Sequence, residues 1–191
     1  MDLKAQWIWK ERGDYQLYND AAMFRKTFDL SKPCTGRIAV TADSWYRLYV
    51  NGEWVADGPC RSWPEHYQYD VLDVCAYLKE GKNEIVAIAR YFGVGTFHQV
   101  PREAGFLLQL DAETGAGPVH IATDESWEAA DYGPLERWTP KLSVQMEPLE
   151  QIDMRREGSD FEPAVVRYSA SEGPWKDLNP RDVALLTLEP A

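Results

Sequence analysis

The sequence has no apolar run approaching the roughly 18 residues that a membrane-spanning helix requires, so we expect no membrane segment. Residues 1–6 also lack the apolar core of a secretory signal peptide. From these two absences we predict a cytoplasmic protein.

Positive charge is scarce. The chain has 20 Lys plus Arg against 31 Asp plus Glu, which gives a formal net charge of −11. A surface of this sign repels the phosphates of nucleic acids and the headgroups of anionic lipids. We therefore expect no nucleic acid partner and no membrane partner.

Cysteine and histidine are too few and too scattered to form a metal or redox motif. Cys34, Cys60 and Cys75 contain no C-x-x-C spacing, and an odd number cannot form a closed set of disulfides. We interpret them as reduced structural thiols. The three histidines, His66, His98 and His120, do not stand at metal-ligand spacing either.

No cofactor is predicted. A Gly-x-Gly at residues 93–95 lacks both the third glycine and the following helix of a nucleotide-binding loop. No D-x-D-x-D-G loop for calcium is present. A structural calcium ion remains an alternative because oxygen ligands are plentiful in a chain with 31 acidic residues.

Catalytic signatures are also missing. There is no G-x-S-x-G nucleophile motif. A glycosidase needs two carboxyl groups that face one bond, and 31 acidic residues single out no such pair. We name no catalytic residue and expect that this chain is not itself an enzyme.

Helical periodicity is almost absent, and short alternating segments between turn signals dominate, which is typical of an all-β sandwich or barrel. A length of 191 residues favours one domain. Strands are expected at residues 7–9, 22–29, 37–42, 45–50, 53–57, 67–74, 84–91, 106–110, 119–123 and 127–129. One short helical turn is expected within residues 73–78.

The strongest local pattern is a hairpin. Asn51-Gly52 separates two alternating runs, and both residues tolerate the positive φ that a two-residue turn requires. Alternation divides the first run into two faces. The core face is predicted to carry Tyr46, Leu48 and Val50, and the accessible face Trp45, Arg47 and Tyr49.

The periodicity weakens after Tyr132, so we divide the chain into a β-sandwich domain at residues 1–132 and an extended tail at residues 133–191. The tail has two interpretations. It is an ordered flap that packs on its own sandwich, or it is a linker that leads into a downstream domain that is missing here. Both can hold for different parts of the tail.

Two loops, at residues 59–67 and 91–102, collect aromatic, Arg, His and Gln side chains. Planar donors beside aromatic faces can hold a sugar, because its hydroxyls accept hydrogen bonds while its ring stacks. The alternative is a buried polar network that pins these loops to the sandwich. The candidate side chains are Arg61, Trp63, His66, Tyr67, Tyr91, Phe97, His98, Gln99 and Arg102.

Three stretches carry a family resemblance: residues 46–58 (YRLYVNGEWVADG), 69–74 (YDVLDV) and 78–83 (LKEGKN). They resemble the sugar-binding jelly-roll domains at the amino ends of β-galactosidase-like and α-L-rhamnosidase-like glycoside hydrolases. Further stretches are similar to the α-L-rhamnosidase, family 78-like branch: residues 61–64, 66–70, 95–98, 123–127, 151–157, 174–178 and 180–182.

The resemblance implies a two-sheet antiparallel β-sandwich of galactose-binding, jelly-roll type. It implies that catalysis belongs to a separate (α/α)6 barrel downstream in the parent chain, which removes terminal L-rhamnose from glycans. This chain would then be a non-catalytic amino-terminal accessory domain that binds a rhamnose-containing glycan. The alternative is a purely structural interaction domain without a sugar ligand. Asn51 matches a hairpin Asn that reaches the sugar in β-galactosidase-like relatives, although the turn alone also explains it.

Overall fold

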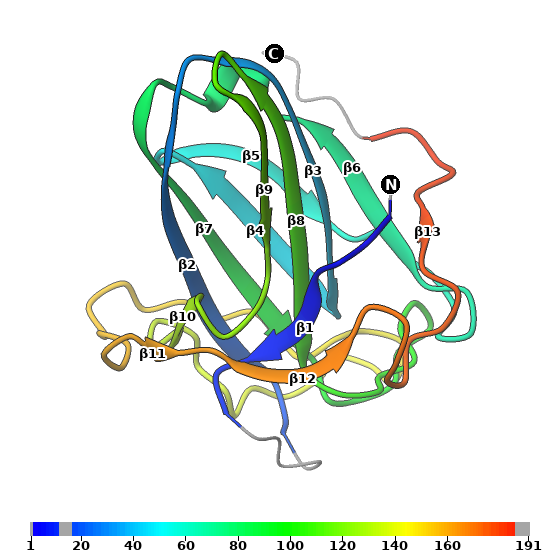
Figure 1. The fold of residues 1–191 in the computed structure, drawn as a ribbon. Coiled ribbons are helices and arrows are strands. Elements are labelled where there is room, and N and C mark those ends of the chain that lie inside the picture. The colour runs from blue at the N-terminus through cyan, green and yellow to red at the C-terminus, as the bar shows by residue number, and fades with distance from the viewer. Residues whose placement is uncertain (1, 12–16, 186–191) are drawn as a thin grey trace, which may run out of the picture.

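The computed structural model describes residues 2–11 and 17–185, which form two β-sheets packed face to face (Figure 1). The first sheet has the order β12 (Val165–Ser169), β1 (Gln6–Trp9), β8 (Gly105–Thr114), β3 (Pro33–Asp43), β6 (Gln68–Asp73) and β13 (Asn179–Pro180), and β9 (Gly117–Ala122) pairs with β8. The second has the order β11 (Glu162–Pro163), β10 (Glu128–Asp131), β2 (Asp20–Leu30), β7 (Gly81–Tyr91), β4 (Trp45–Val50) and β5 (Glu53–Gly58).

All strand pairs are antiparallel except β13 with β6. One 3-10 turn, η1 (Cys75–Tyr77), lies in the segment where a short helical turn is predicted. Within the described ranges, no helix is long and apolar enough to cross a membrane. The predicted fold class, an all-β two-sheet antiparallel sandwich, is confirmed.

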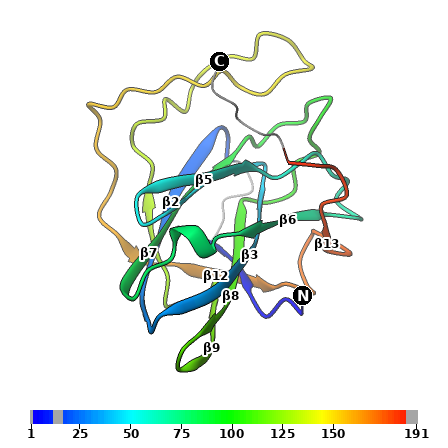
Figure 2. The same ribbon diagram turned by 90° about the horizontal axis from the view of Figure 1, so that it is seen from above.

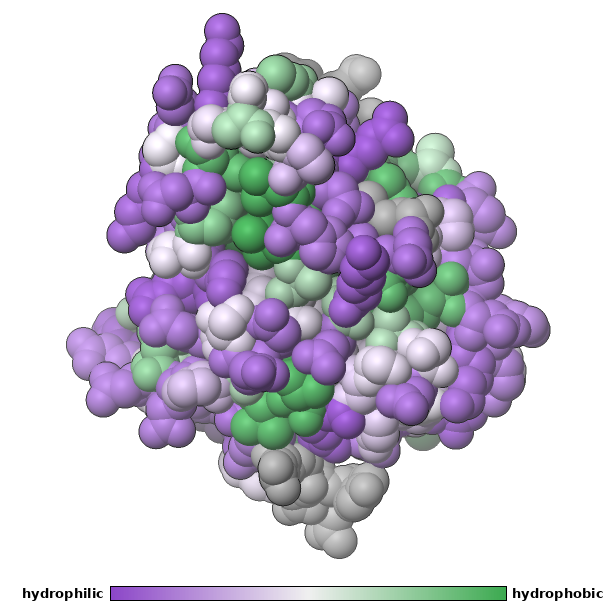
Figure 3. Space-filling view, viewed as in Figure 1, coloured by the Kyte–Doolittle hydropathy of each residue, from purple (hydrophilic) through white to green (hydrophobic). Residues whose placement is uncertain are grey.

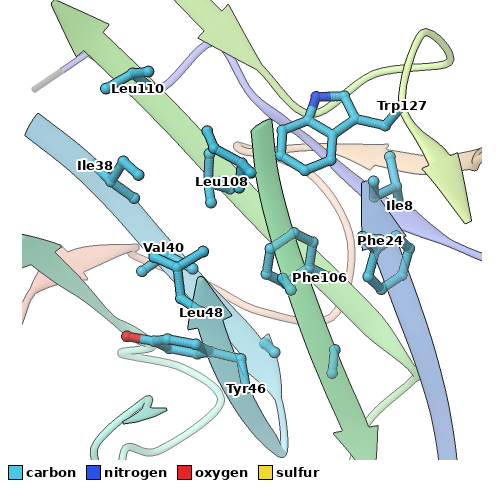
Figure 4. Close-up of a cluster of buried hydrophobic side chains, with 14 of the residues drawn as sticks. Ile8, Phe24, Ile38, Val40, Tyr46, Leu48, Phe106, Leu108, Leu110 and Trp127 are labelled. Carbon is cyan, nitrogen blue, oxygen red and sulfur yellow. The ribbon is translucent and has the colours of Figure 1, made fainter. Parts of the chain in front are cut away.

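The core lies between the sheets and is built by alternation along each strand. On β4, Tyr46, Leu48 and Val50 are fully buried, while the intervening side chains are half-buried on the outer face, as predicted. Phe24 of β2 stacks on Phe106 of β8 with 4.9 Å between ring centroids. Figure 4 shows these rings among Ile8, Ile38, Val40, Leu108, Leu110 and Trp127.

The turn between β4 and β5 has the conformation that its sequence predicts. Asn51 and Gly52 have φ angles of 52° and 81°, and Val50 pairs with Glu53 across the turn. Positive φ at both central residues matches the right-handed twist of the two strands. The hairpin prediction is confirmed.

Residues 133–185 contribute three short strands, β11, β12 and β13, which pair with β10, β1 and β6 respectively. Periodicity did not predict these three strands. Trp175 from this segment is 1% exposed and stacks on Trp7, with 3.8 Å between ring centroids. Residues 134–153 form an irregular hairpin, joined at the pairs Leu135–Ile152 and Lys141–Pro148. We call it the roof hairpin. Figure 2 shows it in yellow, beyond β5 and on the far side of the molecule from β9.

The outer face of the first sheet, seen in Figure 3, is largely hydrophilic. Val119 and Ile121 of β9 pair with the buried Ala112 and Leu110 and pack against the core on the inner side of this sheet. Exposed large apolar side chains occur on the roof hairpin, at Trp138, Leu142, Val144 and Met146.

Candidate functional site

The structure brings the two predicted loops together at one end of the sandwich. Arg102 Nη2 in the second loop lies 3.0 Å from Glu65 Oε1 in the first. Gln99 Nε2 lies 3.4 Å from the Tyr67 hydroxyl. The question is whether these side chains form an open site or an internal network.

At the centre of this end lies Asp43, which sequence reasoning missed. Its carboxylate is buried and accepts four hydrogen bonds, from Ser44 Oγ at 3.0 Å, Gln99 Nε2 at 3.1 Å, Arg102 N at 3.0 Å and Trp175 Nε1 at 3.0 Å. Burial raises the pKa of Asp43 to about 6. One carboxylate therefore ties β3, the second loop and the carboxyl-terminal segment together.

Three of the predicted residues belong to this internal network. Tyr67, Tyr91 and Gln99 are each less than a tenth exposed. The Tyr67 hydroxyl donates to Ala42 O at 3.0 Å, and the Tyr91 hydroxyl donates to Arg102 O at 3.1 Å. Burial raises the pKa of Tyr91 to about 12. These contacts fit the polar network that pins the loops, the alternative interpretation of the sequence.

The other loop candidates are exposed. Trp63 is 58% exposed, and its backbone pairs with that of His66, whose Nδ1 lies 3.3 Å from Asp177 Oδ2. Within the described ranges no hydrogen bond, ion pair or ring stacking joins two of these side chains. They give the loops an aromatic and cationic rim, to which the following side chains belong: Arg61, Trp63, His66, Phe97, His98 and Arg102.

Asn51 lies at the opposite end of β4 and β7 from these loops (Figure 1). Its Nδ2 donates to Tyr77 O at 2.8 Å and to Asn83 Oδ1 at 2.9 Å, and its Oδ1 accepts from Glu84 N at 3.0 Å. A ligand would have to replace these bonds, so the contacts explain Asn51 as a turn residue.

A separate hollow of about 260 Å³ lies between the outer face of the second sheet and the roof hairpin. We call it the aromatic pocket. Its floor is the accessible face of β4 together with β7, and its roof comes from the segment after β10. The lining residues are Ala21, Trp45, Arg47, Tyr49, Ile88, Arg90, Tyr132, Leu135, Glu150, Ile152 and Met154.

Arg90 holds the roof against the floor. It is 5% exposed, and its guanidinium donates to Asn19 Oδ1 at 2.8 Å, to Pro148 O at 2.7 Å and to Glu150 Oε2 at 3.2 Å. Burial lowers the pKa of Arg90. Because each of its three nitrogens meets a different acceptor, the position of the roof hairpin is fixed relative to β7.

The floor combines aromatic faces with neutralised charges. Arg47 pairs through two parallel bonds with Asp57, at 2.9 and 2.7 Å, which raises the pKa of Arg47. Its guanidinium carbon lies 5.1 Å from the Trp45 ring centroid. The Tyr49 hydroxyl bonds to none of the described residues and is available to a ligand. Such a floor suits a neutral ligand with one apolar face.

Sequence reasoning identified the accessible face of β4 but did not predict the pocket. Trp45, Arg47 and Tyr49 are separated from the roof hairpin by about 90 positions in the chain, and no local pattern reports a contact of that range. The accessible mixture of a cation with aromatics was the one signal available.

Metal ligands do not gather anywhere in the described ranges: no group of three or more His, Cys, Asp or Glu side chains is positioned to hold an ion. The structural calcium weighed from the sequence therefore has no identified ligand set, and it stays an untested alternative.

Residues 31–176 match the family model described as the Alpha-L-rhamnosidase N-terminal domain. A GH78 family rhamnosidase of Bacillus sp. GL1 is 31% identical, with a TM-score of 0.83, over 95% of this chain and 20% of that chain. An α-L-rhamnosidase of Streptomyces avermitilis, described as complexed with L-rhamnose, is 24% identical, with a TM-score of 0.64, over 92% and 16%. This chain thus spans about a fifth of the length of these enzymes. No curated protein sequence matches.

A lectin of Pleurotus ostreatus, described in complex with GalNAc, shares the fold with a TM-score of 0.57. It is 19% identical over 91% of this chain and 46% of the lectin. At that identity the likeness shows the fold alone.

Proposed function

The chain belongs to the α-L-rhamnosidase N-terminal domain family, and from this premise we propose that it is a non-catalytic, carbohydrate-binding accessory domain of a rhamnosidase. Its ligand is a rhamnose-containing glycan. Its partner is the catalytic (α/α)6 barrel of the parent chain.

The aromatic pocket is the observation that carries the proposal. Trp45 and Tyr49 offer ring faces for the C–H-rich side of a sugar, and the free Tyr49 hydroxyl and Arg47 offer polar partners for its hydroxyls. In each of the pairs Arg47–Asp57 and Arg90–Glu150, the carboxylate neutralises the guanidinium. A pocket without net charge favours an uncharged sugar over an acidic one. The lectin of the same fold, described with GalNAc, supports sugar binding by such a sandwich.

The pocket supports binding rather than cleavage. Of its lining residues only Glu150 carries a carboxyl group, and that group accepts from Arg90. Glycoside hydrolysis in most families uses two carboxyl groups on opposite sides of the scissile bond. Hydrolysis of the rhamnosyl bond is therefore assigned to another part of the parent enzyme.

Calorimetric titration with L-rhamnose and with rhamnose-terminated oligosaccharides tests this proposal. Tyr49→Ala removes a ring and a hydroxyl from the pocket floor, and we expect about tenfold weaker binding, roughly 1.4 kcal/mol. Trp63→Ala is the matched control at the predicted loop site, and we expect unchanged affinity. Loss of binding in Trp63→Ala with retention in Tyr49→Ala would move the site to the loops.

A second candidate function is structural. Large apolar side chains are exposed along the roof hairpin, among them Leu142 at 69% and Val144 at 80%. Such a patch is typical of a surface that another domain covers. If the wild-type chain takes up none of these sugars, this candidate replaces carbohydrate binding, with a neighbouring domain of the parent chain as the partner.

A further inference from the structure

Trp138 on the roof hairpin is the most exposed tryptophan of the chain, at 77%. It does not line the aromatic pocket. An indole left in water forgoes the free energy that burial of a large apolar side chain gives. Its exposure therefore calls for a physical reason, which the surrounding contacts provide.

The exposed ring is held rigidly. Tyr18 stacks against Trp138, with 5.9 Å between ring centroids and 12° between planes, and its hydroxyl donates to Thr139 O at 2.6 Å. The buried side chain of Asn19 clamps the same stretch of backbone. Its Nδ2 lies 3.0 Å from Glu136 O, 3.0 Å from Arg137 O and 3.1 Å from Thr139 Oγ1.

Polar side chains lie next to the backbone of Trp138. The Trp138 backbone N–H donates to Glu136 Oε1 at 3.3 Å, and Glu136 Oε2 pairs with Arg156 Nη1 at 2.9 Å. Both side chains are partly exposed, at 39% and 45%. A pyranose whose C–H face stacks on the exposed indole needs donors and acceptors for its hydroxyls, and the Glu136–Arg156 pair supplies both kinds of group close to the Trp138 backbone.

We propose that Trp138, with Glu136 and Arg156, is a second, surface subsite for a pyranose unit of an oligosaccharide. The proposal rests on the function proposed above and deepens it, because it extends recognition from one sugar to a chain of several. The aromatic pocket holds one unit, and Trp138 holds another on the outer side of the same hairpin.

The surroundings favour a glycan over a protein partner at Trp138. The side chains at the end of the roof hairpin, Leu142 and Val144, are exposed and apolar, and their neighbours Ser143 and Gln145 are uncharged. Trp138 instead adjoins the Glu136–Arg156 pair. A protein partner would cover the apolar end together with Trp138, which makes the two cases separable.

Titration of the wild-type chain and of Trp138→Ala with L-rhamnose and with an α-linked L-rhamnose tetrasaccharide tests the subsite. Val144→Ala, on the same hairpin and 80% exposed, is the matched control. We expect Trp138→Ala to weaken tetrasaccharide binding about tenfold and to leave monosaccharide binding unchanged. Trp138→Tyr should restore part of the affinity, and Val144→Ala should bind both ligands like the wild type.

Equal tetrasaccharide affinities in the wild type and Trp138→Ala would overturn the subsite while leaving the aromatic pocket intact. Absence of all glycan binding in the wild type would overturn the subsite and the proposed function together. Equal weakening by Trp138→Ala and Val144→Ala would show a general effect on the hairpin instead of a sugar contact at Trp138, and it too would overturn the subsite. Matching melting temperatures of the variants exclude loss of folding as the cause.

Discussion

Asp43 and Arg90 are buried charged residues that hold loops against the sandwich. Asp43 joins β3 to the second loop and to Trp175, and Arg90 joins β7 to the roof hairpin. Each satisfies several partners at once, which offsets part of the free energy that burying a charge costs. Polar contacts thus fix the second loop and the roof hairpin, whereas hydrophobic burial holds the two sheets together.

The pH dependence of stability reports on Asp43. Folding raises its pKa from 3.8 to about 6, so between these pH values the native state holds more protons than the unfolded chain. Its contribution to the free energy of unfolding therefore falls as the pH rises from about 4 to about 6, and stays low above that range. We expect the difference in unfolding free energy, wild type minus Asp43→Asn, to fall by on the order of 3 kcal/mol between about pH 4 and about pH 7.

Urea denaturation of both proteins across this range measures that difference. Subtracting the variant cancels the titration of the other carboxyl groups, which the two proteins share. A difference that does not change with pH would show that the Asp43 carboxyl group titrates normally in the native state.

At the scale of single residues, sequence reasoning predicted the chemistry of the loops better than the positions of their side chains. It included Tyr67, Tyr91 and Gln99 among nine loop candidates and weighed a buried polar network against a sugar site for the whole set. It could not identify Asp43, because no neighbouring residue in the sequence distinguishes a buried aspartate with several hydrogen-bond partners from an aspartate on the surface. The partners of Asp43 lie as far along the chain as Trp175.

At the scale of elements, the hairpin between β4 and β5 gives the clearest relation between sequence and conformation. Gly52 has a φ of +81°, and a Cβ added there would meet nothing within 4 Å. Replacement by Val therefore tests backbone strain without any steric clash. We expect Gly52→Val to lower the unfolding free energy by about 1–2 kcal/mol, because a left-handed conformation is costly for a β-branched residue.

Gly95→Val is the control for that variant. Gly95 also has open space around its Cα, and its φ lies outside the left-handed region. Its replacement should change the midpoint of urea unfolding little. If both variants unfold at the same urea concentration, the positive φ of Gly52 does not contribute to stability.

The strands that sequence reasoning predicted are those with their own periodicity, such as β2, β4 and β7. Those it did not predict are β11, β12 and β13, which form at sheet edges. β11 and β13 contain two residues each, and each includes a proline. Pairing with an existing sheet edge fixes their conformation, and their own sequence carries no alternation that could reveal it.

At the scale of the whole molecule, the second sheet provides the floor of the aromatic pocket and the segment after β10 provides its roof. The accessible face of β4 was predictable from alternation, as were the sandwich class and the core face. The aromatic pocket was not, because it exists only where the roof hairpin crosses that face. The division of the chain at residues 132 and 133 stays a prediction, and so does a downstream domain.

The proposed function depends on a sugar entering the aromatic pocket, and nuclear magnetic resonance with L-rhamnose tests this directly. The indole N–H signals of the eight tryptophans report separate places on the surface and in the core. We expect the Trp45 indole and the amides of Arg47 and Tyr49 to shift in a saturable way at millimolar sugar, while the Trp63 indole stays unchanged. Shifts confined to Trp63 and His98, or no shifts at all, would contradict it.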